Sequence, residues 1–130
     1  MDYGGHSSLF SSNVIIASNG QNCLGTASFV AGSATQIFDN DCVVYGKERV
    51  DDLFENCDGA NLRPNVPIRG YNNRFYTKLG NATVTCDCCG EITLAELSKI
   101  DNTIEQNYSA FLLPTSDQII QWGRNKLLIN

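Results

Sequence analysis

The stretch FDNDCVVYG (residues 38–46) decides the predicted fold, because it places an aromatic residue, a polar step and an apolar strand in direct succession. The same order occurs in FSSNVIIAS (10–18) and, less closely, in YNNRFYTKL (71–79). Aligning Phe10, Phe38 and Tyr71 brings the three segments into register at offsets of 28 and 33 residues. Each repeat is therefore long enough for a strand, two turns and further strands.

The polar step of each repeat contains an asparagine, at Asn13, Asn40 and Asn73. Such a step fits the corner of a solenoid better than a flat hairpin, because Asn adopts the left-handed conformation at low cost. In a solenoid, strands of successive coils pair in parallel and the corner amides can bond in a ladder. We predict an all-β fold with parallel β-helix coils over residues 1–92. A β-sandwich or jelly roll, which has short strands at similar spacing, is the alternative.

The C-terminal third predicts helices. TLAE (93–96) and TSDQ (115–118) both match the capping box, so a short helix should run from Leu94 to about Ile100 and a second should follow Pro114. The second helix would carry an apolar stripe with Trp122 beside it, and the stripe consists of Ile119, Ile120, Gly123 and Leu127. We expect residues 93–130 to form a helical cap that seals the last coil, within one structural domain.

Composition argues against a nucleic-acid surface and against a membrane-spanning segment. The formal net charge is −5, and the nearest basic residues, Arg63, Arg69, Arg74 and Lys78, are spread out, so a nucleic-acid surface is not expected. No apolar run approaches the length of a membrane span. The start, MDYGGHSSLF, has no signal-peptide pattern, and we interpret the chain as a mature or excised segment of a longer one.

Cysteine content and sequons predict a secreted glycoprotein with disulfides. The six cysteines are Cys23, Cys42, Cys57, Cys86, Cys88 and Cys89, and the two glycosylation candidates are Asn81 and Asn107. A cytosolic protein with reduced thiols is the alternative. Fifteen pairings of six cysteines exist. Our preference joins Cys42 to Cys57 and forms at least one local bond within 86–89.

Several longer segments resemble a known family. DYGGHSSLFSSNVII, NCLGTASFVAG, IFDNDCVVYG, NNRFYTKLGNATVTC and GEITLAEL together resemble the C-terminal portion of secreted right-handed parallel β-helix proteins, in the pectate-lyase-like superfamily. The resemblance spans about residues 2–128. It implies a right-handed parallel β-helix with a helical C-terminal cap and coils upstream of this segment. It also implies binding or processing of acidic polysaccharides, by lyases or epimerases that use a basic residue and sometimes calcium.

No residues of this chain match a catalytic motif of such enzymes, so enzymatic activity is left uncertain, with lyase- or epimerase-like chemistry as the form it would take. We expect a non-catalytic extracellular domain that binds polysaccharide. The alternative is a structural or adhesion module that self-associates through stacked coils. The expected partner is accordingly an extracellular glycan or another copy of the chain.

Candidate sites compete with structural interpretations. His6 lies between glycines and serines and is interpreted as structural, and CDCCG (86–90) favours disulfides over zinc. No cofactor is expected, with calcium at the acidic residues Asp39, Asp41, Asp51 and Asp52 as the alternative to solvated carboxylates. The candidate sugar-stacking aromatics, which are core residues in the simpler interpretation, are Tyr3, Tyr45, Tyr71, Phe75, Tyr76 and Tyr108.

Overall fold

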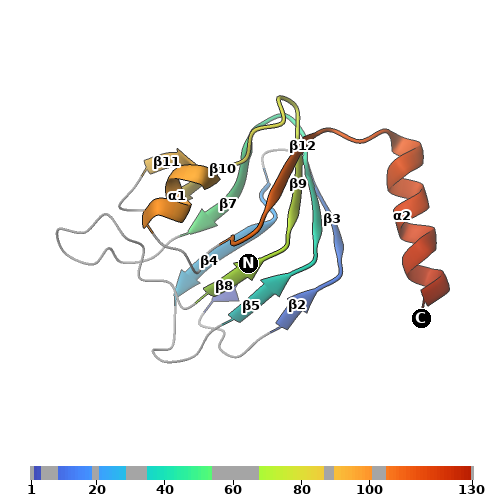
Figure 1. The fold of residues 1–130 in the computed structure, drawn as a ribbon, viewed down its shortest axis with the longest axis horizontal. Helices are drawn as coiled ribbons and strands as arrows, with labels where there is room; N and C mark the ends of the chain where they lie inside the picture. The colour runs from blue at the N-terminus through green and yellow to red at the C-terminus, as the bar shows by residue number, and fades with distance from the viewer. Residues whose placement is uncertain are drawn as a thin grey trace.

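The computed structural model describes residues 2–3, 9–18, 21–28, 35–53, 68–86, 90–100 and 105–129. Most of the regular structure in this part of the chain is strand, arranged in three sheets with two helices outside them (Figure 1). The predicted predominance of strands is confirmed. The sheets are parallel or mixed.

The chain visits the three sheets in the same order three times, and we call each visit a pass. The first pass (9–28) contains β2 (Leu9–Ser11), β3 (Val14–Ala17) and β4 (Leu24–Ser28). The second (35–53) contains β5 (Thr35–Phe38), β6 (Asp41–Val44) and β7 (Arg49–Leu53). The third (68–86) contains β8 (Ile68–Tyr71), β9 (Arg74–Thr77) and β10 (Thr83–Cys86). Corresponding strands of successive passes pair in parallel, as β2-β5-β8, β3-β6-β9 and β4-β7-β10.

Three further strands extend these sheets. β1 (Asp2–Tyr3) pairs in parallel with β4, and β12 (Ser109–Leu112) pairs in parallel with β9. β11 (Gly90–Thr93) is antiparallel to β10, which makes the third sheet mixed. The region predicted as a helical cap therefore also contributes a strand, β12.

Between the first two passes, the strand register is shifted by one residue from the register that the aligned aromatics predict. Ser11, not Phe10, lies opposite Phe38, and Phe10 lies opposite Ile37. The predicted column is correct for Phe38 and Tyr71, whose rings stack with centroids 4.8 Å apart. It is wrong for Phe10, because the corner asparagines rather than the aromatics set the register. A slip of one residue moves a side chain to the opposite face of its strand.

The corner conformation also differs in detail from the prediction. The left-handed residue is the one before each corner asparagine, with φ of 57° at Ser12, 56° at Asp39 and 55° at Asn72. Asn107 repeats this conformation with φ of 51°. The left-handed residue turns the chain from a strand of the first sheet into a strand of the second. The side chain of the asparagine that follows forms hydrogen bonds to the neighbouring pass.

The hydrophobic core lies between the sheets and includes the first helix. Cys42, Val44, Phe75 and Val84 are at most 3% exposed and belong to one cluster with Leu94 and Leu97 of α1 (Leu94–Ile100). The predicted capping box is present, since the Glu96 amide donates to Thr93 Oγ1 at 3.1 Å. Figure 1 shows α1 beside β10 and β11.

The second helix, α2 (Ser116–Ile129), forms as predicted but packs differently. Its capping box is reciprocal, with Gln118 N donating to Thr115 Oγ1 and Thr115 N donating to Gln118 Oε1. Ile120 and Leu127, predicted to seal the last coil, are 52% and 78% exposed. Trp122 instead contacts Tyr76 of β9, which places α2 beside the second sheet (Figure 1). The sealing role predicted for this helix is wrong.

Candidate functional site

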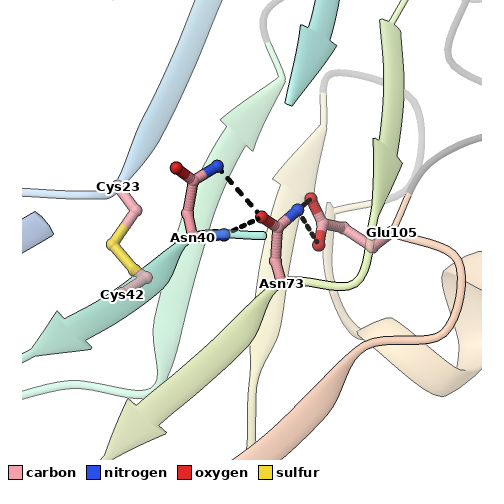
Figure 2. Close-up of a disulfide and its surroundings, with 5 residues drawn as sticks. All are labelled: Cys23, Asn40, Cys42, Asn73 and Glu105. Carbon is pink, nitrogen blue, oxygen red and sulfur yellow. Dashed lines mark hydrogen bonds between the residues drawn. A yellow bond between two sulfur atoms is a disulfide. The ribbon is translucent and has the colours of Figure 1, made fainter. Parts of the chain in front are cut away.

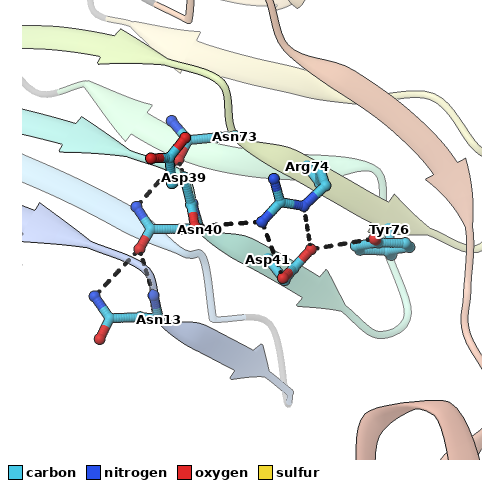
Figure 3. Close-up of polar contacts among 7 residues, drawn as sticks. All are labelled: Asn13, Asp39, Asn40, Asp41, Asn73, Arg74 and Tyr76. Atoms are coloured by element: carbon cyan, nitrogen blue, oxygen red, sulfur yellow. Dashed lines mark hydrogen bonds and ion pairs between the residues drawn. The ribbon is translucent and has the colours of Figure 1, made fainter. Parts of the chain in front are cut away.

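The corner asparagines form a hydrogen-bonded ladder across the passes, as predicted (Figure 3). Asn13 Nδ2 donates to Asn40 Oδ1 at 3.1 Å, and Asn40 Nδ2 donates to Asn73 Oδ1 at 3.0 Å. The main-chain N–H groups of Asn13 and Asn40 donate to the same oxygens. Asn40 and Asn73 are 2% exposed. The amide–amide hydrogen bonds of the ladder are all donated toward the later pass, while the Nδ2 groups of Asn40 and Asn73 also donate to the Phe10 and Ile37 carbonyls of the earlier pass.

The ladder ends on Glu105, which the sequence analysis did not identify (Figure 2). Asn73 Nδ2 lies 3.3 Å from both carboxylate oxygens of Glu105, which is 2% exposed. Glu105 lies over Gly70, where an added Cβ would come within 2.6 Å of Glu105 Oε1 and 2.9 Å of its main-chain nitrogen. Glycine at position 70 therefore makes room for the carboxylate that ends the ladder.

Burial has the largest effect on the pKa of Glu105. Removal from water raises the pKa of this carboxyl group well above its usual value, and the nearby Asp51 carboxylate raises it further. The hydrogen bond from Asn73 acts in the opposite direction. Asp51 is itself 1% exposed. The interior therefore favours a protonated carboxyl group at the end of the ladder.

A cavity of about 160 Å³ lies among the passes. Its walls combine apolar side chains with the ladder and two buried acids. The residues that line it include Phe10, Asn13, Ile15, Cys23, Asp51 and Glu105. Cys42 also lines it and forms a disulfide with Cys23 (Figure 2). The preferred Cys42–Cys57 bond is therefore wrong. Cys23 immediately precedes β4 and reaches β6 across the interior, a contact that sequence spacing does not reveal.

A second group of side chains lies on the outer face of the second sheet, and we call Asp41, Arg74, Tyr76, Phe111 and Trp122 the outer-face cluster. Arg74 Nε and Nη2 donate to the two oxygens of Asp41 at 2.5 and 3.1 Å. Tyr76 donates its hydroxyl proton to Asp41 Oδ1 at 3.2 Å (Figure 3). These contacts hold the charged groups in fixed positions.

The aromatic members of the outer-face cluster come from three elements. Tyr76 of β9 stacks on Phe111 of β12 at a centroid distance of 5.2 Å, and Trp122 of α2 is tilted against Tyr76 at 5.0 Å. Phe111 is 46% exposed. Burial, followed by the Asp41 carboxylate, raises the pKa of Tyr76 to about 12. The phenol therefore stays protonated at neutral pH and acts as a hydrogen-bond donor.

The structure separates most residues of the predicted sugar platform. Tyr71 stacks on Phe38, Phe75 is 3% exposed in the core, and Tyr108 packs against the core. Tyr45 is 37% exposed, outside the cluster. Only Tyr76 of the described candidates joins the outer-face cluster. Its companion Phe111 was missed and Trp122 was assigned to the cap, because β12 and α2 reach β9 through contacts distant in sequence.

The predicted acidic group is likewise divided. Asp41 faces Arg74 on the outside, whereas Asp51 lines the interior cavity. Among the described residues, no group of three or more His, Cys, Asp or Glu side chains is arranged to hold a metal ion. Nothing in this part of the chain supports the calcium alternative.

The two sequons differ in their surroundings. Asn81 is exposed in the turn between β9 and β10. Asn107 is also exposed, but its Nδ2 donates to Asn72 Oδ1 at 2.6 Å. The remaining candidates, His6, Cys57, Cys88, Cys89 and Arg63, lie outside the described residues, as do the side chains of Tyr3, Asp52 and Cys86.

Comparison with protein families, with curated proteins and with solved structures found no match for this chain. Neither helix of the described part is long and apolar enough to cross a membrane. The disulfide is compatible with an oxidising, extracellular environment.

Proposed function

We propose that the protein is a non-catalytic, extracellular right-handed parallel β-helix domain that binds an extended glycan on the outer face of its second sheet. The repeated visits to three sheets and the parallel pairing between passes support the β-helix. The right hand follows from the strong preference for right-handed connections between parallel strands. The disulfide and the exposed sequon at Asn81 support the extracellular location.

The observation that carries the proposed binding function is the outer-face cluster. Glycan rings present apolar C–H faces and polar hydroxyl edges, so they are bound by surfaces that combine aromatic rings with fixed hydrogen-bonding groups. Phe111 offers a partly exposed ring, Arg74 has N–H groups beyond those given to Asp41 and Asp39, and the Tyr76 oxygen can accept a hydrogen bond. Arg74 remains 38% exposed while it holds Asp41.

The polar groups of the cluster suit binding better than proton transfer. Asp41 accepts hydrogen bonds from both Arg74 and Tyr76, so its carboxylate oxygens are already engaged. The raised pKa of Tyr76, about 12, keeps its proton in place. A general base needs a pKa near the working pH and room beside the proton it removes. Tyr76 does not meet that requirement.

A glycan array followed by calorimetry on the strongest binder tests the proposal. We expect Phe111→Ala to weaken binding by up to about tenfold, because loss of an aromatic contact costs about 0.5–1.5 kcal/mol. Leu127→Ala is the matched control, since Leu127 is 78% exposed on α2 and lies outside the cluster. Equal loss in both variants, or no glycan bound by the parent chain, would contradict the proposal.

A further inference from the structure

The first pass differs from the others in charge. Asp2 is the only charged residue before Asp39, so the whole of 9–28 carries none. The register makes the contrast specific, because Val14 occupies the position held by Asp41 and Arg74 in the next two passes. Edge strands of soluble proteins usually carry charges that discourage pairing with other chains. This edge carries no such protection.

Apolar side chains are exposed on the same pass. Leu9 is 62%, Phe10 48% and Ile16 51% exposed, and they belong to β2 and β3. In the described part of the chain, both strands are at the outer edge of their sheets, paired on one side with β5 and β6. We call β2, β3 and the corner between them the first-pass edge.

Main-chain groups of β3 are directed toward this edge. The carbonyl groups of Asn13 and Ala17 accept hydrogen bonds from Asp41 N and Tyr45 N of the second pass. Since successive residues of a strand direct their N–H and C=O groups to alternate sides, those of Val14 and Ile16 face away from β6. Another strand can therefore pair with β3 without disturbing the existing sheet.

We propose that the first-pass edge binds a second copy of this chain about a two-fold axis, with β3 antiparallel to its counterpart. A two-fold interface requires a self-complementary surface, and two-fold dimers are the commonest oligomers. An uncharged edge meets no like-charge repulsion from its own copy, although the whole chain carries −5. The exposed Asn13 carboxamide has both a donor and an acceptor, so it too can bond to an identical surface.

The opposite end does not fit the first-pass edge, which disfavours head-to-tail stacking. The ladder ends there on Glu105, and the pairing register places Tyr108 where an asparagine would continue it. The third sheet ends with β11, which is antiparallel to its neighbour. A copy docked at that end would meet no asparagine ladder and, in the third sheet, no parallel strand.

Light scattering and sedimentation across a wide range of protein concentration test the proposal. We expect a monomer–dimer equilibrium, with no growth beyond the dimer. Ile16→Lys should weaken dimerisation by at least about tenfold, because each copy then brings an ammonium group to the interface. Leu127→Lys, which adds the same charge at an exposed apolar position on α2, should leave dimerisation unchanged.

Hydrogen exchange of the unmodified chain supplies a readout that does not depend on a variant folding. The amides of Val14 and Ile16 should exchange more slowly at high than at low protein concentration, while those of α2 should not change. A chain that is monomeric throughout, an open-ended polymer, or a dimer whose protection lies away from β2 and β3 would each overturn the proposal.

Discussion

The first-pass edge and the Glu105 end of the ladder are built from different chemistry. At the Glu105 end, a buried carboxyl group accepts the last side-chain hydrogen bonds and Leu94 and Leu97 of α1 complete the core. At the first-pass edge, Asn13, Leu9 and Phe10 are exposed. Substitutions of the same kind should therefore have large effects at one end and small effects at the other.

The largest difference in the free energy of unfolding is expected between leucine substitutions in the two helices. Leu97 of α1 is 0% exposed, so Leu97→Ala should lower the free energy of unfolding by about 2–5 kcal/mol. Leu127→Ala on α2 should change it by no more than about 0.5 kcal/mol. Urea denaturation followed by circular dichroism measures both. Similar losses in the two variants would show that α2 belongs to the core.

The disulfide is expected to have the next largest effect, because it ties the first pass to the second. Closing a loop of 19 residues stabilises a protein by about 3 kcal/mol in the chain-entropy account. Replacing both Cys23 and Cys42 with alanine should lower the free energy of unfolding by about that amount. Peptide mapping without reduction should recover Cys23 linked to Cys42 in the unmodified chain. Recovery of Cys42 linked to another cysteine would refute the pairing.

The ladder allows one substitution to be compared at two of its positions. Asn73→Ala leaves buried partners on Asn40 and Ile37 unsatisfied, which should cost about 1–3 kcal/mol. Asn13→Ala removes an exposed donor and should cost about 1 kcal/mol or less. Denaturation at low protein concentration keeps association out of the comparison. Equal costs would mean that the ladder is not continuous.

The free energy of unfolding should depend on pH through the protonation of Glu105 at its end of the ladder. Its folded-state pKa is raised above the unfolded value, so the folded state binds more protons and stability falls as pH rises between the two values. Glu105→Gln should therefore be more stable than the parent chain at neutral pH. The difference should disappear below the unfolded pKa, where both states of the parent are protonated. Denaturation over a pH series measures it, and a constant or reversed difference would contradict the account.

Local signals in the sequence predicted much of the fold. The asparagine steps identified the corners, and the TLAE and TSDQ segments identified both helix starts, because each depends on contacts within a few residues. The one-residue error at Phe10 arose because aromatic spacing was used for register where the asparagine ladder determines it.

The remaining features depend on contacts between distant segments. Two similar capping boxes start two helices, yet only α1 enters the core, and the sequence of each helix does not distinguish these outcomes. Glu105 reaches Asn73 because Gly70 leaves space beneath it, which requires the two passes to be placed first. The outer-face cluster likewise forms only when β12 and α2 lie beside β9.

The central claim is that successive passes stack in parallel in the register of the ladder. Nuclear Overhauser effects between backbone protons of β3, β6 and β9 test it most directly. The account predicts contacts typical of parallel strands that align Ile15 with Cys42 and Cys42 with Phe75. Close contacts between α-protons on facing strands, which are typical of antiparallel pairs, or a register that separates Asn13, Asn40 and Asn73, would contradict it.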